Sequence, residues 1–327
     1  MDKKVVTPDF YQAFTCLAGS CPDTCCKGWD IVVDDETLDF YDSLNDENIK
    51  KNLAVDEDGD TVLRFVGGVC PFLTGGGLCD IQSNFGGDKL CAVCRTFPRI
   101  TQDYTEFEER LLTLACPQAA RLMITSGCRF DFIADTSVVR TDNGYSGELM
   151  NFLLHARFLT AEIFRSDEPF SEKLRRSFAL TASVQRLLDD ESFTAAPHED
   201  TSAEKLSHDE IFDMHRSMDV MDSDWLTQVE SVRSCIRPDT LDGELSSLAL
   251  YYIARYYLTA VSTYDVITTM VRLQSACEVC ACLISAENAQ QNAARRALIY
   301  QKYSKEIEHS DENLDLFTAK AEEILPL

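Results

Sequence analysis

The N-terminal part of the chain carries closely spaced cysteines that an apolar core does not require. Ten of the fourteen cysteines precede residue 130. Nine of them fall into short-spaced sets, which are Cys16-x4-Cys21-x3-Cys25-Cys26, Cys70-x8-Cys79, Cys91-x2-Cys94 and the later Cys116. Thiolates a few residues apart can converge on one metal from a single tight loop. The first 130 residues are therefore predicted to fold around a metal centre.

The expected cellular compartment decides how these cysteines are interpreted. Residues 1–10 contain no apolar stretch followed by a small-residue cleavage site, and no uninterrupted apolar run of about 18 residues occurs anywhere. We therefore expect a cytoplasmic protein without a membrane partner. Because disulfides are rare in a reducing cytosol, a cysteine framework there indicates metal binding rather than cross-linking.

Residue types alone separate iron–sulfur from zinc only in part, because both accept thiolates. All five histidines follow residue 150, so mixed Cys/His zinc patterns are excluded from the cysteine-rich region. The adjacent Cys25 and Cys26 are awkward ligands for one tetrahedral ion but can bind different atoms of a cluster. We favour a [4Fe–4S] cluster and keep zinc as the alternative. The candidate ligands are Cys16, Cys21, Cys25, Cys26, Cys70, Cys79, Cys91, Cys94 and Cys116.

One [4Fe–4S] cluster uses only four thiolates, so either two centres exist or several of these cysteines are not ligands. The five remaining cysteines are not predicted to be metal ligands. Cys277, Cys280 and Cys282 lie in a strongly helical stretch on an apolar stripe, so they are predicted to be core residues. Cys235 is isolated and is predicted to pack likewise, whereas the role of Cys128 stays open.

Hydrophobic periodicity predicts a mainly α protein. A small, irregular, metal-stapled cysteine-rich module over residues 1–130 is followed by a helical bundle over residues 131–327. Within the module we expect a strand at 31–33, a helix at 36–44 capped by Asp34 or Asp35, and a strand at 61–66. Further helices are expected over residues 117–124, 148–164, 172–188, 210–226, 244–261, 264–285, 288–307 and 311–325.

The formal net charge of -25 restricts the class of partner. Such a surface repels nucleic-acid phosphates, so DNA and RNA are not expected as partners. It attracts lysine- or arginine-rich protein surfaces, although solubility alone would explain the same charge.

The cysteine pattern, taken with its flanking residues, resembles the flagellin lysine-N-methylase family. The resemblance rests on Cys-Cys-x-Gly-Trp at 25–29, Cys-Pro-Phe-Leu at 70–73, Leu-Cys-x-Ile-Gln at 78–82, Cys-Arg-Thr-Phe-Pro-Arg at 94–99 and Leu-Ala-Cys-Pro-Gln-Ala-Ala-Arg-Leu at 114–122. Residues 16–99 also look like a zinc- or iron-chelating cysteine-cluster domain. The resemblance implies methyl transfer from S-adenosylmethionine to lysines of flagellin, with a [4Fe–4S] cluster held by the N-terminal cysteines. The alternative function is a non-catalytic zinc- or iron-binding interaction module.

The sequence lacks the usual signatures of an S-adenosylmethionine site. It has neither a Gly-x-Gly-x-x-Gly turn between a strand and a helix nor the Cys-x3-Cys-x2-Cys loop of radical enzymes. A cofactor site of another kind, between module and bundle, is therefore expected. Arg95 and Arg99 are candidates to hold the cofactor carboxylate or to offset the charge of the cluster, and simple salt bridges are the alternative. Trp29 is a candidate either to shield the cluster or to stack on adenine.

A lysine amine must lose a proton before it attacks a methyl group, so the site needs a base or a means of lowering the amine pKa. Four side chains that follow the Phe-Pro-Arg turn are candidates by position alone: Tyr104, Glu106, Glu108 and Glu109.

Overall fold

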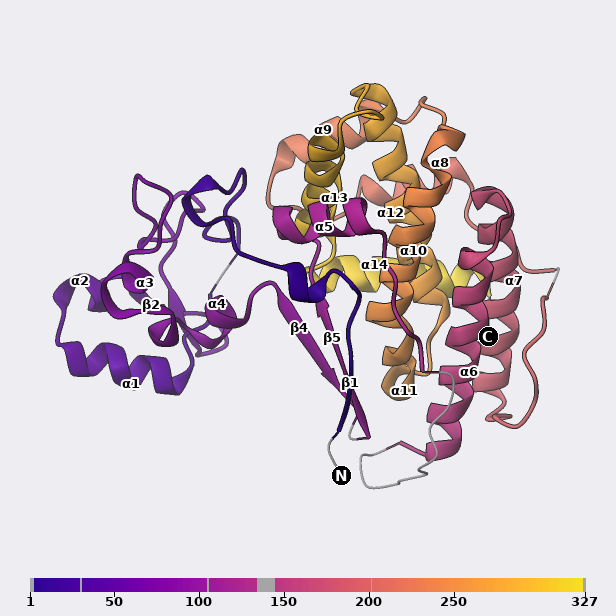
Figure 1. Cartoon of the computed structure of the whole chain (residues 1–327), viewed down its shortest axis with the longest axis horizontal. Helices are drawn as coiled ribbons and strands as arrows, with labels where there is room; N and C mark the ends of the chain where they lie inside the picture. Colours follow the sequence, from indigo (N-terminus) through magenta and orange to yellow (C-terminus); the bar gives the residue numbers. More distant parts are fainter. Residues whose placement is uncertain (1–2, 30, 105, 134–144, 201, 326–327) are drawn as a thin grey trace.

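The computed structural model describes residues 3–29, 31–104, 106–133, 145–200 and 202–325. Figure 1 shows a small lobe, which we call the cysteine module (residues 16–98), beside a larger helical body. The mainly α fold predicted from the sequence, with an irregular cysteine-rich part at the N-terminal end, is confirmed.

The cysteine module combines short helices with a two-stranded ribbon. Its elements are α1 (Asp35–Leu44), α2 (Glu47–Lys50), β2 (Leu53–Val55), β3 (Thr61–Leu63), α3 (Asp80–Phe85) and α4 (Ala92–Thr96). Asp34 caps α1 as predicted, because its side chain accepts a hydrogen bond from Thr37 N. The same carboxylate accepts from Ala92 N at 2.6 Å and so joins α1 to α4.

The strands predicted in this lobe are shorter in the structure. The strand expected at 31–33 is reduced to a single bridge between Val32 and Val62, and the one expected at 61–66 ends at Leu63. A separate hydrophobic core holds the lobe together. It contains Ile31, Val33, Tyr41, Ile49, Leu63, Cys70, Phe72, Ile81 and Cys91.

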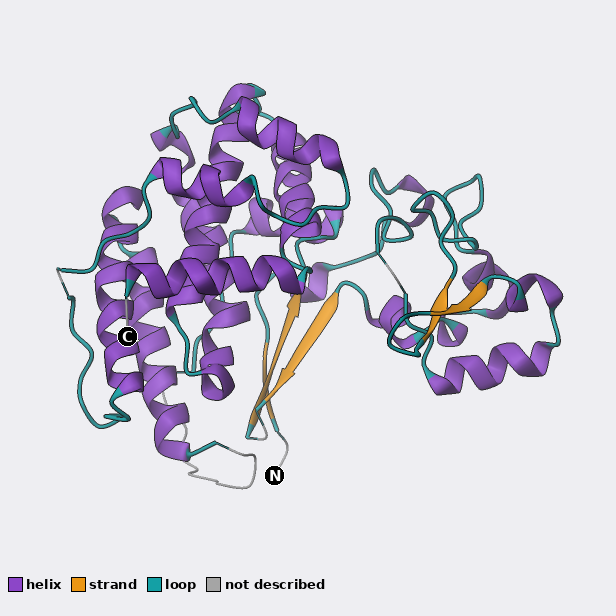
Figure 2. Ribbon diagram, turned by 180° about the vertical axis from the view of Figure 1, so that it is seen from behind, coloured by secondary structure: helices purple, strands orange, loops and turns teal. Residues whose placement is uncertain are grey.

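A three-stranded sheet, which the sequence analysis did not predict, lies between the module and the helices (Figure 2). It contains β1 (Lys4–Val6), β4 (Arg99–Asp103) and β5 (Phe107–Leu112) in the order β1-β5-β4. The central strand β5 runs parallel to β1 and antiparallel to β4. Its side chains alternate toward the main core, where Phe107, Glu109 and Leu111 are buried.

The helical body supplies most of the chain. Its helices are α5 (Pro117–Ser126), α6 (Gly147–Arg165), α7 (Phe170–Asp189), α8 (His208–His215), α9 (Ser223–Ser231), α10 (Asp242–Tyr256), α11 (Ala260–Thr263), α12 (Ile267–Ala286), α13 (Ala293–Ile307) and α14 (Asp311–Ile324). The single helix predicted for 210–226 is wrong, because α8 ends at His215 and Asp222 starts α9 as a new N-cap. The helix predicted for 244–261 is likewise interrupted after Tyr256 by a 3₁₀ turn.

Helix α12 occupies the centre of the body. Its length and apolar composition alone would allow it to cross a membrane, but 94% of that window is buried inside the protein. Cys277, Cys280 and Cys282 on this helix are all buried, as predicted, and Cys128 also lies in the main core. Cys235 is half-buried against that core.

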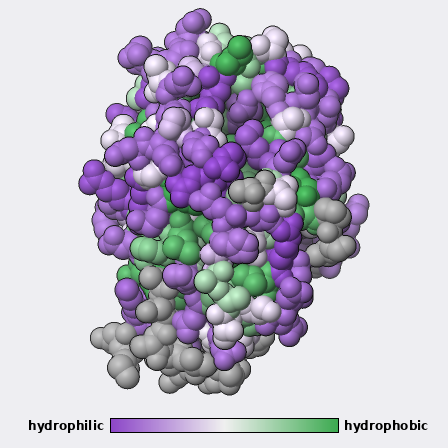
Figure 3. Space-filling view, turned by 90° about the vertical axis from the view of Figure 1, so that its right-hand side faces the viewer, coloured by the Kyte–Doolittle hydropathy of each residue, from purple (hydrophilic) through white to green (hydrophobic). Residues whose placement is uncertain are grey.

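Two hydrophobic cores therefore organise the chain, and the main one draws on both of its ends. Residues 6–14 and 104–133 pack with the helices rather than with the module. The domain boundary predicted at residue 130 stays a prediction, and the segment 134–144 beyond it lies outside the described residues. Figure 3 shows that hydrophilic residues cover most of one face of the body.

Glu109 and Arg157 form an ion pair inside the main core, where both side chains are 0% exposed. The guanidinium donates two hydrogen bonds to the carboxylate, at 2.8 and 2.7 Å, and thereby joins β5 to α6. This two-point geometry compensates the desolvation of both charges. Glu109 therefore has a structural role, because its carboxylate neutralises the buried Arg157 guanidinium.

We expect Glu109→Ala to lower the free energy of unfolding by about 3–5 kcal/mol, because it leaves a charged guanidinium unpaired in the core. Urea unfolding followed by circular dichroism measures this loss. Glu108→Ala is the matched control on the same strand, since its partner Arg110 is 43% exposed and the loss there is expected to be much smaller. Equal losses in the two variants would contradict the assignment.

A second buried polar group makes stability depend on pH. His215 is 1% exposed, with Nδ1 against the Ile211 carbonyl at 2.7 Å and Nε2 3.3 Å from the Tyr303 hydroxyl. Burial lowers the pKa of His215 from 6.5 to about 4.

The unfolded chain binds a proton at this histidine near pH 6.5, whereas the folded chain does so only near pH 4. The free energy of unfolding should therefore fall as pH drops through this window, by about 3 kcal/mol in total. His215→Phe should remove this share of the pH dependence. Urea unfolding of both proteins at several pH values measures it, and parallel pH profiles would refute it.

Candidate functional site

Eight of the nine candidate cysteine ligands lie in the cysteine module, and Cys116 lies in the main core. All fourteen cysteines are among the described residues, and all are free thiols. Burial and mutual electrostatic influence divide the nine into two sets. We call Cys16, Cys21, Cys25 and Cys116 the body-side group, and Cys26, Cys70, Cys79, Cys91 and Cys94 the module group.

The body-side group draws its thiols from both lobes. Cys116 is buried in the main core, whereas the other three lie on the loop that begins the module. Burial, with the charges of Cys21 and Cys16 adding to it, raises the pKa of Cys116 to about 11. The pKa of the Cys21 thiol is likewise raised by burial, with a contribution from Cys16. These thiols are close enough to oppose one another's ionisation.

The module group is built into the small core. Burial, reinforced by the charges of Cys26, Cys79 and Cys91, raises the pKa of Cys70 to about 12. The neighbouring Cys94 thiol lowers the pKa of Cys91, and Cys91, together with burial, raises the pKa of Cys94. The hydroxyl of Tyr41 lies 3.8 Å from the same Cys91 sulfur.

Cys25 and Cys26 connect the two groups. The neighbouring Cys25 thiol lowers the pKa of Cys26 to about 6, and Cys26, together with burial, raises the pKa of Cys25. Within each of these two pairs, ionisation of one thiol disfavours ionisation of the other. A metal centre would remove this restriction, because a bound cation deprotonates the thiols that coordinate it. The donor set therefore fits a thiolate-ligated metal.

Three of the cysteines occupy helix N-termini. Cys79, Cys91 and Cys116 are the residues that immediately precede α3, α4 and α5. The backbone N–H groups of Gln118 and Ala119 act to lower the pKa of Cys116, against the larger effect of burial. Such positions favour a thiolate, because the first N–H groups of a helix lack partners within it.

A single zinc ion requires thiol ligands that lie close together. Zn–S bonds of ~2.3 Å in a tetrahedron place two sulfurs roughly 3.8 Å apart. Among the described His, Cys, Asp and Glu side chains, the group whose donor atoms lie within 4.8 Å of one another is His208, Glu278 and Cys282 in the helical body. The described thiols of the module and body-side groups do not form such a set of three in this structure.

Trp29 packs where the Cys25 loop meets the helical body. Its indole N–H donates to the Cys25 carbonyl at 2.8 Å, and its ring contacts Phe97 and His309 edge-on, each with centroids 5.5 Å apart. The Lys305 ammonium lies 5.5 Å from the ring centroid. The two predicted roles of Trp29, shielding and stacking, both stay predictions.

The other predicted site residues lie away from the thiols' shared space. Arg95 donates to the carbonyls of Asp88 and Leu90 in its own lobe, and Arg99 is stacked 5.1 Å from the Phe14 ring centroid. Their predicted cofactor role stays a prediction. Of the base candidates, Glu109 is paired with Arg157, Glu108 with Arg110, and Tyr104 is buried.

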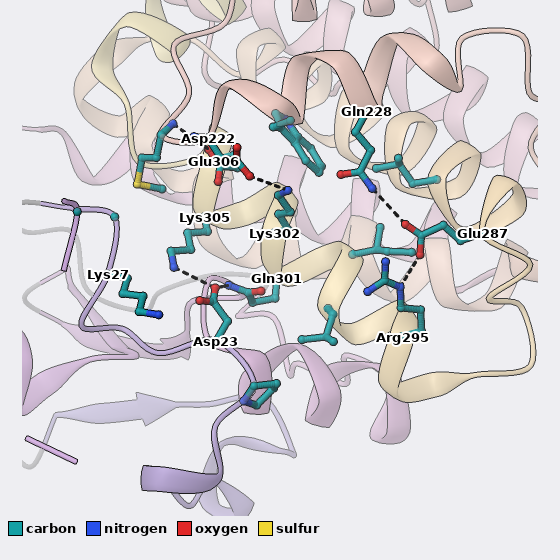
Figure 4. A pocket seen from close by; sticks show the side chains of 18 residues that line it. Asp23, Lys27, Asp222, Gln228, Glu287, Arg295, Gln301, Lys302, Lys305 and Glu306 are labelled. Atoms are coloured by element: carbon teal, nitrogen blue, oxygen red, sulfur yellow. Dashed lines mark hydrogen bonds and ion pairs between the residues drawn. The ribbon is translucent and has the colours of Figure 1, made fainter. Parts of the chain in front are cut away.

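A cleft of about 520 Å³ opens between the module loop and the helical body (Figure 4). One wall comes from the segment that carries the first cysteines, through Pro22, Asp23, Lys27 and Gly28. The opposite wall comes from α9, α12 and α13, and contributes Trp225, Gln228, Leu283, Glu287, Arg295, Leu298, Ile299, Gln301, Lys302, Lys305 and Glu306. The cleft therefore lies directly beside the body-side thiols.

Asp23 joins the two walls. Its Oδ2 atom accepts from Lys305 Nζ at 2.9 Å and from Gln301 Nε2 at 2.7 Å, as Figure 4 shows. Gly28 permits this close approach, since its φ of +94° is left-handed and a Cβ would lie 3.0 Å from Met221 Sδ and 3.3 Å from Lys305 Cε.

The cleft is lined by carboxylates, by cationic side chains and by the aromatic side chain of Trp225. Glu306 Oε2 accepts from the N–H groups of Met221 and Asp222, and burial raises the pKa of Glu306. Trp225 is 1% exposed, and its indole N–H has no hydrogen-bond partner within the described part of the chain. Lys302 binds Asp222 at 3.1 Å and lies 5.4 Å from the Trp225 ring centroid. A polar ligand that bears both charges fits such a lining.

Sequence reasoning did not find the cleft residues. Asp23 lies 202 residues before Trp225 and 283 residues before Glu306, and no spacing relates them. The one sequence signal was indirect, since Asp23 lies two residues after Cys21.

A buried polar network ties the Cys116 loop to the helical body. Glu308 accepts hydrogen bonds from the hydroxyls of Tyr252 at 2.6 Å and Tyr256 at 2.8 Å, and pairs with Arg255 at 3.2 Å. Arg255 also donates to Thr113 Oγ1 at 3.1 Å, three residues before Cys116.

The residue after Glu308 extends this network to the module. His309 Nε2 lies 3.3 Å from the same Thr113 hydroxyl, and its ring is the one that contacts Trp29. The tyrosine-rich helix α10 therefore holds the loop that leads to Cys116. Through Thr113 and His309 it is also connected to Trp29, which follows the Cys25 loop.

Part of the chain is similar to curated bacterial proteins. A lysine-N-methylase of Salmonella typhimurium is 30% identical over 149 residues, which make up 42% of this chain and 37% of that protein. The lysine-N-methylase of Salmonella choleraesuis is also 30% identical over 149 residues, with the same shares of both chains. The flagellar biosynthetic protein FliU of Salmonella muenchen is 33% identical over 124 residues, or 35% of this chain and 73% of that protein.

The chain thus spans little more than a third of the length of the two lysine-N-methylases, and nearly three quarters of FliU. No protein-family model matches the chain, and no solved structure matches it.

Proposed function

Because the chain belongs to the flagellin lysine-N-methylase family, we propose that it transfers methyl groups from S-adenosylmethionine to lysine ε-amines of flagellin or another lysine-rich protein. The proposal places the reaction in the cleft beside the body-side thiols and locates the protein in the cytoplasm. The observation that supports it most directly is that this cleft is walled on one side by the cysteine loop and on the other by α9 and α13.

The lining of the cleft matches the two reactants that the proposal requires. S-adenosylmethionine, when bound, supplies an electrophilic methyl group on a positively charged sulfur. The free Trp225 N–H can donate to an acceptor of a bound molecule, and Lys302 or Arg295 can bind a carboxylate. The aromatic face of Trp225 and the carboxylates of the cleft suit a cationic sulfur or an ammonium.

Glu306 is the proposed proton acceptor. Burial raises the pKa of its carboxyl, which makes the carboxylate a stronger base than an exposed glutamate. Two backbone N–H groups bind Oε2 and so hold the side chain in one position. In the proposed reaction Glu306 takes the proton of the lysine ammonium, which frees the nitrogen lone pair for attack on the methyl group.

We further propose that the nine cysteines hold an iron–sulfur centre, with zinc as the alternative metal. The body-side and module groups would supply its thiolates, and the centre would offset their charge and order the loop that forms one wall of the cleft. The net charge of -25 supports a basic, lysine-bearing protein as the partner, because opposite charge speeds encounter.

Incubation of the pure protein with flagellin and S-adenosylmethionine should add mass to flagellin lysines in steps of ~14 Da, one CH2 per methyl group. Glu306→Gln should lower the rate by about 10²–10⁴-fold, as expected for the loss of a general base. Intact-protein mass spectrometry over time measures both.

Glu312→Gln on α14, outside the cleft, is the control and should keep the wild-type rate. An active Glu306→Gln variant would remove Glu306 from the mechanism. Tight metal binding without either methylation or S-adenosylmethionine affinity in calorimetry would instead favour the interaction-module function.

Anaerobically purified protein should contain iron and acid-labile sulfide. Cys25→Ala and Cys26→Ala should lose this iron and loosen the module, because metal binding orders segments that cannot fold alone. Cys280→Ala, a buried cysteine of α12, is the control and should keep the wild-type iron content. Elemental analysis and visible absorption measure the outcome. A colourless protein whose zinc content depends on Cys26 would establish zinc as the metal.

A further inference from the structure

One cysteine of α12 differs from its neighbours in what it faces. Cys277 and Cys280 are buried among apolar residues, and Cys277 has a backbone carbonyl as its polar neighbour, at 3.8 Å. Cys282 instead faces His208 and Glu278. We propose that His208, Glu278 and Cys282 form a second metal site, in the helical body, that binds zinc.

The three donor atoms are already close together. The histidine nitrogen, the carboxylate oxygen and the cysteine sulfur all lie within 4.8 Å of one another. Glu278 and Cys282 are four residues apart on α12, so both point to the same side of that helix. His208 is the first residue of α8, where the Ser207–Glu210 capping box fixes the local backbone.

The imidazole of His208 is oriented as a metal ligand would be. Its Nε2 atom lies 2.5 Å from the carbonyl oxygen of Arg233, so the proton of a neutral ring is held there. Metal-bound histidines commonly donate their second N–H to such a carbonyl, which leaves the other nitrogen for the metal. That other nitrogen, Nδ1, is the one that faces Glu278 Oε1, at 2.7 Å.

An ion can enter with a small adjustment. Two ligands at ~2.0–2.1 Å in a tetrahedron are roughly 3.3 Å apart, so the His208–Glu278 distance has to widen by about half an ångström. The side chains of His208 and Glu278 are 34% and 20% exposed, which gives an ion access from solvent. A water molecule would complete the fourth position, and the Cys282 thiol, which here donates to the Cys235 carbonyl at 3.5 Å, would bind the ion as a thiolate.

The ligand types select the metal. An imidazole, a carboxylate and a thiolate together suit zinc better than hard cations such as magnesium or calcium, which prefer oxygen ligands. The site joins three segments that are far apart in the sequence: the start of α8, the loop at 233–235 and α12. Zinc bound here would hold these three segments together. This second site is independent of the N-terminal cysteines and of the proposed methyl transfer.

The test uses the full-length protein with its N-terminal centre intact. After dialysis against a chelator, wild type and variants are equilibrated with Zn²⁺, or with Co²⁺ as a spectroscopic probe. Wild type should bind one equivalent of zinc more than either His208→Gln or Cys282→Ala. It should also show thiolate-to-cobalt absorption that both variants lack. The iron content should be equal in all three proteins.

Cys277→Ala is the matched control, since it removes an equally buried thiol from the same helix outside the group. It should retain the extra zinc, and zinc should raise its melting temperature as it does for wild type. His208→Gln alters a partly exposed side chain and decides the question even where Cys282→Ala fails to fold. Equal zinc and cobalt uptake by wild type and His208→Gln would overturn the site and leave a metal-free His208–Glu278 ion pair.

Discussion

The crowding of nine thiols is the constraint on which the rest of the arrangement depends. Burial and neighbouring thiols raise the pKa of Cys21, Cys70 and Cys116, whereas the nearby charge of Lys305 acts to lower the pKa of Cys21. Thiols in such an arrangement either stay protonated or share a cation. Because Cys116 belongs to the main core and Cys25 to the module, a shared cation also connects the two lobes. The proposed metal centre would therefore also form the joint between the lobes.

The helical body provides a fixed frame for this joint. Glu308 is held by two tyrosines and Arg255, and the same arginine binds Thr113 in the loop that leads to Cys116. A buried network of this kind is rigid only while every member keeps its partner. This explains why a tyrosine-rich helix far from the cysteines in sequence belongs to the same site. Helix α10 positions the loop that carries Cys116.

The sequence predicted the parts of this structure that local chemistry determines. Asp34 was identified as a helix cap because capping involves residues three apart, and the thiols were identified by their short spacing. The sheet was missed because β5 pairs with β1 across about a hundred residues, and neither strand is long enough to signal itself. The division of 210–226 was missed because Glu306, on α13, supplies the acceptor for the backbone of the intervening loop. The cleft could not be predicted for the same reason, because its two walls are brought together only by tertiary packing.

Asp23 connects the loop that carries the first cysteines to the opposite wall of the cleft. Asp23 lies two residues from Cys21 and accepts hydrogen bonds from Gln301 and Lys305 on the opposite wall. Gln301 also donates to the carbonyl of Ala115, next to Cys116, so one side chain contacts both segments that carry body-side thiols. Whatever orders these thiols therefore orders the wall of the cleft. If the proposed metal centre orders this wall and so favours a ligand in the cleft, thermodynamic reciprocity requires that the ligand favour metal binding by the same factor. A centre that performs no chemistry would in this way still control substrate affinity.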